Sequence, residues 1–302
     1  MKLSYVKLSL AEAAIIEHLL ETISKNNTIE QNAQYLSGQL EQIEILNNNF
    51  TQLKTEELDC IIVENLPIIT NLDLAKTLSF AMSLMIGETF QYLQQNDGEV
   101  TAEVKPLAGY EHTISSGGKV LLGWHTDDCM IAKDSRAYWI QLSGFYNPDN
   151  ICTNIAFIDD IVPMLSETTL QILMNQPYYL IIPASFRVEK IWTEVCPIIS
   201  INSSGKYEIG VSAYNDIKCP NQESHDALHE LMEVSSKCKH SINLQPGNAI
   251  FFNNNRLLHS RDPIHSERLV LRTYMIESLA GLRSRTETTE GRVFDLKHLI
   301  ME

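Results

Sequence analysis

The sequence is poor in positive charge, and its first segment contains no unbroken apolar run. Its 23 lysines and arginines are outnumbered by 38 aspartates and glutamates, which gives a formal net charge of −15 and a pI near 5.0. This balance argues against a nucleic-acid partner or an anionic membrane surface, because binding to phosphates is driven by clustered basic side chains. Glu12, Glu17 and Glu21 interrupt the apolar positions near the start. The segment therefore predicts neither a signal peptide nor a membrane span.

Closely spaced cysteines are also lacking. The six cysteines are spread widely and form no CxxC pair, a pattern that fits reduced thiols in a cytoplasmic protein better than a disulfide framework. The chain of 302 residues is long enough to bury a large core. With nucleic acid and membranes disfavoured, small molecules or proteins remain as the expected partners.

The chain divides into a helical first third and a strand-rich remainder. Apolar residues at helical spacing predict helices over 9–26 and about 70–95, with Thr70 or Asn71 as N-cap of the second. The stretch LDCIIVENL between them predicts a strand. Many short strand candidates follow, bounded by turn signals such as NPDN, NSSGK and QPGN. They are RAYWIQLSGF, CTNIAFI, YYLIIPASF, CPIISIN, YEIGVSAY, HSINL, AIFFN and RLVLRTYMI.

These strand candidates predict a sandwich or jelly roll, because they show no regular alternation with helices. Helical insertions are expected over 160–175 and 221–239. We expect a mainly β fold with helical additions, of the α+β class. One domain would span 1–302, with a largely helical portion over about 1–100 packed on a jelly-roll core over about 105–280.

The stretch GWHTDDCM, residues 123 to 130, directly follows the apolar run KVLL. Alternate side chains of a strand share a face, so His125 and Asp127 would point the same way. His259 likewise ends the apolar stretch RLLH. Two histidines and one carboxylate form the facial triad of non-haem Fe(II) oxygenases, which leaves three metal positions open. A structural ion pair between His125 and Asp127 is the alternative.

Two arginines follow the second histidine in the segment ERLVLRTYMI. Arg268 and Arg272 are four residues apart around the start of a strand, so both guanidinium groups could enter the barrel. Buried arginines are costly unless paired, and their planar fork suits carboxylates. The pattern therefore predicts a cosubstrate that carries a carboxylate.

Taken in order, these motifs resemble the clavaminate synthase-like branch of the Fe(II)/2-oxoglutarate-dependent oxygenases, which is related to taurine dioxygenase and includes hydroxylases of free amino acids. The resemblance covers roughly 105–280 and is carried by EHTISSGGKVLLGWHTDDCM, RAYWIQLSGFYNPDNICTNIAF, PGNAIFFNNNRLLHSRDP and ERLVLRTYMI. It implies a double-stranded β-helix, also called a jelly-roll or cupin-like core. It also implies Fe(II) as the metal, 2-oxoglutarate as cosubstrate and O2 as oxidant.

The resemblance implies a role for each matching residue. His125, Asp127 and His259 match the iron ligands. Arg268 matches the arginine that holds the distal carboxylate of 2-oxoglutarate, and Thr153 matches the hydroxyl residue that assists it. Related halogenases replace the carboxylate ligand by a small residue to admit chloride, so Asp127 favours hydroxylation.

Three further residues match positions that contact the substrate. Arg272 matches an arginine that often holds the substrate carboxylate, although the roles of Arg272 and Arg268 could be exchanged. His112 falls near a position, often glutamine, that touches the substrate. Asp216 in VSAYNDIKCP stands where relatives with basic substrates place an acidic residue. An exposed turn aspartate is the alternative reading of Asp216.

The implied activity is hydroxylation of an unactivated C–H bond of a free L-amino acid, with decarboxylation of 2-oxoglutarate to succinate and CO2. The acidic net charge favours a basic substrate such as lysine, arginine or ornithine. A substrate of another kind, a carrier-tethered substrate, and desaturation or cyclisation are alternatives within the family.

Two readings outside the family stay open. His225 and His229 in HDALH echo the HExxH motif of zinc hydrolases, with Asp226 in place of the glutamate. A solvated amphipathic helix is the simpler account of that segment. The second alternative is a jelly-roll binding protein without catalysis. It is disfavoured because a site that has lost its activity has no physical need of two buried arginines.

Overall fold

Two main β-sheets form the framework of the molecule. The computed structural model describes residues 2–182, 192–213 and 217–300. The larger sheet has eight strands. In order across the sheet they are β1 (Leu3–Lys7), β2 (Cys60–Glu64), β14 (Ala249–Asn253), β6 (Trp139–Tyr146), β16 (Leu269–Ile276), β3 (Glu88–Tyr92) and β17 (Val293–Phe294), with β4 (Thr101–Val104) also paired to β16.

The smaller main sheet has four strands and carries most of the expected site. Its order is β13 (His240–Asn243), β7 (Cys152–Phe157), β15 (Leu257–Arg261) and β5 (Leu122–His125), and all its pairings are antiparallel. Two small sheets complete the described strands: β12 (Ile217–Lys218), β8 (Tyr178–Ile181) and β9 (Trp192–Cys196), and β10 (Ile199–Ile201) with β11 (Tyr207–Ile209).

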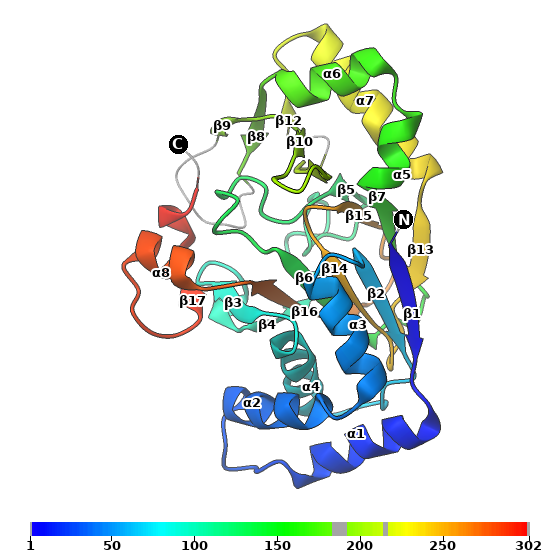
Figure 1. Cartoon of the computed structure of the whole chain (residues 1–302), viewed down its shortest axis with the longest axis vertical. Coiled ribbons are helices and arrows are strands. Elements are labelled where there is room, and N and C mark those ends of the chain that lie inside the picture. The colour runs from blue at the N-terminus through cyan, green and yellow to red at the C-terminus, as the bar shows by residue number, and fades with distance from the viewer. Residues whose placement is uncertain (1, 183–191, 214–216, 301–302) are drawn as a thin grey trace.

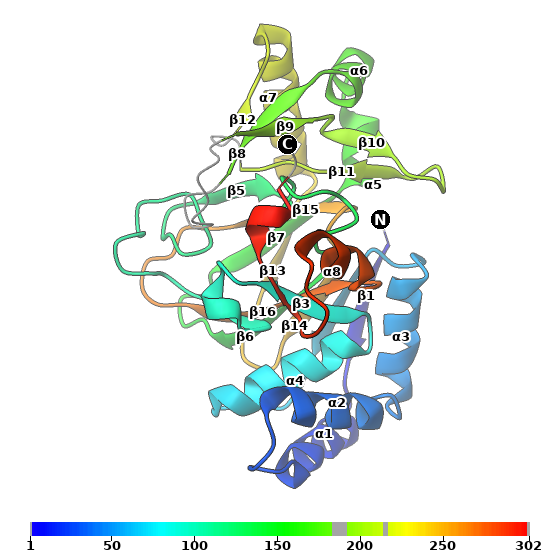
Figure 2. The same ribbon diagram turned by 90° about the vertical axis from the view of Figure 1, so that its left-hand side faces the viewer.

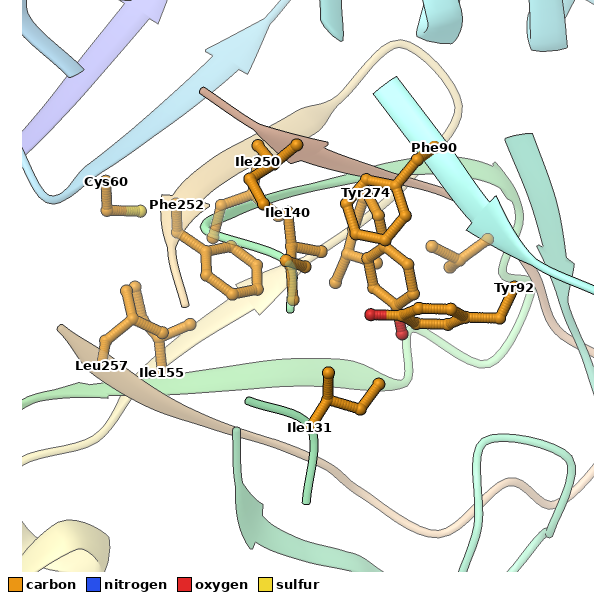
Figure 3. Packing of buried hydrophobic residues seen from close by; sticks show 14 of the residues in the cluster. Cys60, Phe90, Tyr92, Ile131, Ile140, Ile155, Ile250, Phe252, Leu257 and Tyr274 are labelled. Carbon is orange, nitrogen blue, oxygen red and sulfur yellow. The ribbon is translucent and has the colours of Figure 1, made fainter. Parts of the chain in front are cut away.

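The central core lies between the two main sheets. Ile140 and Tyr274 reach it from the large sheet, and Ile155 and Leu257 reach it from the small one (Figure 3). Side chains alternate along a strand. In β16, Val270 and Tyr274 therefore join this core, whereas Met275 packs on the opposite face. The same alternation turns the even-numbered arginines of this segment towards the space between the sheets.

Helices cover the outer faces of both main sheets. Helices α1 (Leu10–Thr22), α2 (Ile29–Leu40), α3 (Glu44–Lys54) and α4 (Leu72–Leu84) share an apolar cluster with the large sheet and lie together at the lower end of the view (Figure 1). Helices α5 (Ile158–Ile161), α6 (Glu167–Asn175) and α7 (Gln222–Lys237) pack with the small sheet, and α6 and α7 form the upper end (Figure 2). The remaining helical segments are α8 (Ala280–Thr286) and the short turns η1 (Asn96–Gly98), η2 (Val162–Met164) and η5 (Leu296–His298).

The helix expected over 70–95 is wrong in its second half. Its N-cap is Asn71, whose side chain accepts a hydrogen bond from the backbone N–H of Leu74, but the helix ends at Leu84. The stretch ETFQY forms strand β3 instead, as suits its aromatic and β-branched residues. Gly87 allows the close approach to β16, because a Cβ there would lie 2.7 Å from the carbonyl oxygen of Ile276. Within the described residues, no helix is long and apolar enough to cross a membrane.

Candidate metal centre

Two histidines and one aspartate converge at the edge of the small sheet. His125 ends β5 and pairs directly with His259 of β15 across the ladder. Asp127 lies in the turn after β5, and its Oδ1 is 3.4 Å from His125 Nε2 and 3.3 Å from His259 Nε2. Adjacent ligands of an octahedral ion lie about 3 Å apart for bonds of about 2.1 Å. Among the described residues, these three form the one group of such side chains close enough to share a metal ion.

Both imidazoles present a ring nitrogen suited to a metal. His125 Nδ1 lies 2.8 Å from the carbonyl oxygen of Gly123, and because that oxygen can only accept, Nδ1 donates to it and Nε2 is the ring nitrogen that faces Asp127. Burial, reinforced by neighbouring His125, lowers the pKa of His259 to about 4. His259 is therefore uncharged at neutral pH. Two imidazoles and one carboxylate fit Fe(II) in the facial-triad arrangement.

The outer oxygen of Asp127 is held by two donors from β16. Arg272 Nη1 and the Tyr274 hydroxyl each donate to Oδ2 at 2.8 Å. Burial alone would raise the pKa of Asp127, but the positive charge of Arg272 holds it well below the usual aspartate value. Asp127 is therefore ionised and available as a ligand throughout the neutral range.

The backbone of Asp127 is fixed by Asn254. The Asn254 side chain accepts from the backbone N–H of Asp127 at 3.0 Å and donates to its carbonyl oxygen at 2.9 Å. It also donates to the carbonyl oxygen of Ala137 at 3.1 Å. The run of three asparagines (NNN) that precedes His259 in the sequence indicated a polar turn near the site, but the sequence did not show which residue the asparagines would contact.

A second pair of predicted residues meets on the same inner face. Arg268 Nη2 donates to Thr153 Oγ1 at 2.8 Å, and both side chains are buried. Burial, together with the positive charge of Arg261, lowers the pKa of Arg268 to about 10. Arg261 stands opposite Thr153 in the ladder and donates to the carbonyl oxygens of Gly118 and Val120. The two cationic groups make this end of the site a receptor for an anion.

The metal ligands and the Arg268 receptor line one cavity of about 410 Å³. One wall is the loop 105–121, which is closed on itself by a hydrogen bond from the Leu107 N–H to the Gly117 carbonyl at 2.8 Å. Another wall contains Asp128, which is buried at a positive φ of 58°. Burial and the charge of Asp127 raise the pKa of Asp128 to about 7. The cavity is large enough to hold two small molecules beside a metal.

Some residues expected from the sequence lie elsewhere. His112 is exposed on the loop 105–121 and is absent from the cavity lining, which instead contains Gln94 and Gln95. Asp216 lies outside the described residues. His225 and His229 are about half exposed on α7, and their nearest carboxylates are those of the same helix. The solvated-helix reading of HDALH matches this placement.

Two histidines and one carboxylate arranged in this way are the facial triad of non-haem Fe(II) oxygenases. The model of a family described as taurine catabolism dioxygenase TauD, TfdA family matches residues 191–274. The resemblance expected from the motifs is thereby confirmed.

Solved structures share the fold over almost the whole chain. Asparagine oxygenase in complex with Fe(II), 2S,3S-3-hydroxyasparagine and succinate matches with a TM-score of 0.87 at 16% identity, over 96% of this chain and 99% of that one. The non-haem iron oxygenase OrfP in complex with Fe and alpha-ketoglutaric acid matches with a TM-score of 0.81 at 18% identity, over the same 96% and 99%. The expected fold class, mainly β with helical additions around a jelly-roll core, is confirmed.

Proposed function

We propose that this protein is a non-haem Fe(II)/2-oxoglutarate-dependent dioxygenase that hydroxylates an unactivated C–H bond of a free L-amino acid. The observation that carries the proposal is the meeting, in one cavity, of a triad of metal ligands and a buried arginine, Arg268, to which the described residues supply no carboxylate partner. A binding protein without catalysis has no need of this combination, because an unpaired buried cation destabilises the folded state.

The residues of the chain divide the work between them. His125, Asp127 and His259 would hold Fe(II), and Arg268 with Thr153 would grip the distal carboxylate of 2-oxoglutarate. When bound, the metal supplies the means to use O2 and 2-oxoglutarate as an oxidant, with succinate and CO2 as by-products. The chain would orient the substrate carbon, and the loop 105–121 forms one wall of the cavity.

A free amino acid is the favoured substrate class. The relatives with similar folds were solved with 3-hydroxyasparagine and with (3S)-hydroxy-L-Arg. Arg272 lines the cavity and would meet an α-carboxylate through its Nε–Nη2 edge, because its Nη1 is bonded to Asp127. Asp97 also lines the cavity, which supports a basic side chain such as that of lysine, arginine or ornithine, and Asp216 is proposed as a further partner of that cation. A substrate of another kind, a carrier-tethered substrate, and desaturation or cyclisation are the second candidates.

Two broader features belong to the same proposal. We assign the whole chain to one oxygenase domain, because β2 of the helical portion is a strand of the large sheet and α4 packs on β16. We assign the protein to the cytoplasm, where its scattered cysteines would stay reduced. The partners would be small molecules.

The test is an aerobic incubation of the purified protein with Fe(II), ascorbate, 2-oxoglutarate and a panel of free L-amino acids that includes arginine, lysine, ornithine and asparagine. The measured quantities are succinate and product mass. We expect one amino acid to gain a single oxygen atom, with succinate formed in step, and His125→Ala to abolish both.

The matched control is His229→Ala, which removes an exposed histidine of α7 and should leave turnover unchanged. Loss of activity in His229→Ala but not in His125→Ala would favour the zinc hydrolase reading instead. Succinate released equally without any amino acid would point to a larger or tethered substrate. No succinate despite bound iron would overturn the proposal.

A further inference from the structure

The two oxygens of the Asp127 carboxylate have different surroundings. Oδ1 faces Nε2 of His125 and of His259 at 3.4 and 3.3 Å, on the side where a metal would sit. Oδ2 points the other way and receives two hydrogen bonds, from Arg272 Nη1 and from the Tyr274 hydroxyl, each of 2.8 Å. Asp127, His259, Arg272 and Tyr274 are buried, and the His125 side chain is 12% exposed. The carboxylate is therefore held at one oxygen and open at the other.

We infer that Arg272 and Tyr274 are positioning residues of the metal centre: they occupy Asp127 Oδ2 and so restrict Asp127 to metal binding through Oδ1 alone. This inference rests on the proposed function, because it concerns the same metal. It assigns Tyr274 a role that the sequence motifs did not suggest, and it gives Arg272 a role other than contact with the substrate.

The strength of this arrangement comes from charge and packing together. Hydrogen bonds between ionised groups are shorter and about twice as strong as those between neutral groups. The Arg272 guanidinium lies 4.4 Å from the centre of the Tyr274 ring, and its Nη2 donates to Gln95 Oε1 at 2.9 Å. These contacts fix the plane of the guanidinium group. A carboxylate that turned to bind a metal through both oxygens would lose two buried hydrogen bonds.

The number of free metal positions depends on this restriction. Three protein atoms leave three positions of an octahedral ion open, whereas a carboxylate bound through both oxygens would leave two. A cosubstrate that binds through two oxygens and a gas molecule need three positions. The hydrogen bonds to Oδ2 therefore preserve the capacity of the centre for both ligands.

Arg272 also has little capacity left for a substrate. Nη1 and Nη2 are engaged by Asp127 and Gln95, and the buried Nε has no hydrogen-bond partner among the residues that the structure describes. A substrate carboxylate could reach the edge formed by Nε and Nη2 only by displacing Gln95. In either case Nη1 stays on Asp127, so the main role of Arg272 is to support the metal ligand.

The test measures metal affinity with Co(II) alone, added under anaerobic conditions and followed by its visible absorption band. Tyr274→Phe removes one donor to Oδ2. The matched control is Tyr92→Phe, because Tyr92 is equally buried in the same core, its ring lies 6.0 Å from that of Tyr274, and its hydroxyl donates to the Ser135 carbonyl (Figure 3). Loss of a residue that supports a metal ligand typically weakens metal binding 10- to 100-fold.

We expect Tyr274→Phe to weaken Co(II) binding about 10-fold and to change the absorption band, and Tyr92→Phe to change neither. Arg272→Met should weaken binding further. If Arg272→Met fails to fold, the pair of tyrosine variants still decides the matter. Affinity and spectrum in Tyr274→Phe equal to those of Tyr92→Phe would overturn the inference.

Failure of the proposed function gives a different result. In that case the wild-type protein would not bind Co(II), or His125→Ala would bind it as tightly as the wild type. The inference about Tyr274 fails alone when His125→Ala abolishes binding and Tyr274→Phe leaves it intact.

Discussion

Arg268 and Arg272 stand at the two ends of one cavity, four residues apart, and differ in what surrounds their charge. Arg272 faces an ionised carboxylate 2.8 Å away. Burial alone would lower its pKa, but Tyr274 and Asp127 raise it above the ordinary arginine value. Arg268 has a hydroxyl partner and a second arginine nearby, and its pKa is lowered to about 10. In the described part of the chain, no ion pair within 4 Å involves Arg268.

The contrast shows that one buried arginine can serve as the structural partner of a carboxylate while another serves as the binding site for an anion. The charge of Arg272 is neutralised within the folded chain, so it stabilises the protein before any ligand arrives. The charge of Arg268 is left uncompensated, so an anion gains most by binding there. This difference supports the assignment of Arg268, rather than Arg272, to the distal carboxylate of 2-oxoglutarate.

The largest expected effect is on the free energy of unfolding, and it tests the contrast between the two arginines. Arg272→Met leaves Asp127 buried without its counter-charge, which costs about 3 to 5 kcal/mol. Arg268→Met removes an uncompensated charge, so the metal-free protein should lose less than about 1 kcal/mol or become more stable. Urea unfolding of both metal-free variants at neutral pH measures the two values. Equal losses of stability would show that the surroundings of the two arginines do not differ in this way.

A smaller effect concerns Asp128, which lies beside the Arg272 end. Burial and the charge of Asp127 raise its pKa from 3.8 to about 7 in the folded protein. A carboxyl group with a raised pKa stabilises the folded state below pH 3.8, and this contribution is lost as the pH rises through 7. Asp128→Asn should therefore gain stability over the wild type between pH 4 and 7, by about 1 kcal/mol for each pH unit.

The measurement for Asp128 is the free energy of unfolding of the metal-free protein at several pH values. The gain of Asp128→Asn should be near zero at pH 4 and largest above pH 7. His259 acts in the opposite sense, because its lowered pKa of about 4 makes stability rise with pH up to about 6.5. The difference between variant and wild type removes that contribution. A gain that is constant with pH would contradict the raised pKa.

The smallest effect sharpens the assignment of the Arg268 end. Thr153→Val keeps the shape of the side chain and removes the hydroxyl that Arg268 contacts. A single hydrogen bond contributes about 1 kcal/mol, so 2-oxoglutarate should bind roughly 5-fold more weakly, by calorimetry without O2. Thr153→Ser retains a hydroxyl and should bind as the wild type does. Weakening by both substitutions alike would assign the effect to packing.

Much of the strand framework was accessible from the sequence because the strands are short and their ends are marked by turns. RAYWIQLSGF contains all of β6 except its last residue, and AIFFN is β14. Helices α2 and α3 were not predicted, since their stretches are rich in asparagine and glutamine and bury only a narrow apolar stripe. Strand β1 also escaped notice, because its pairing with β2 joins segments far apart in the chain.

The site residues, like the strands, could be predicted where the signal lies in the local sequence and not where it depends on a partner far away in the chain. The three ligands could be found because each stands at or beside the end of an apolar stretch. Asn254 and Tyr274 were missed, because their partner Asp127 lies more than 120 residues away and no local pattern shows it. The alternation along β16 already placed Tyr274 on the face of Arg272 and was the available signal for Tyr274. His112 was misplaced because a loop carries no such periodicity.

Because His125 pairs directly with His259, the geometry of the metal centre depends on the register between β5 and β15. Strand β5 is an edge strand of the small sheet, and its pairing with β15 becomes irregular beyond that pair. A slip of one residue would turn every side chain of β5 to the opposite face, and His125 would point away from His259. A bound ion would thus stabilise the chain only when β5 is in the correct register, and it would hold this edge strand in place during folding.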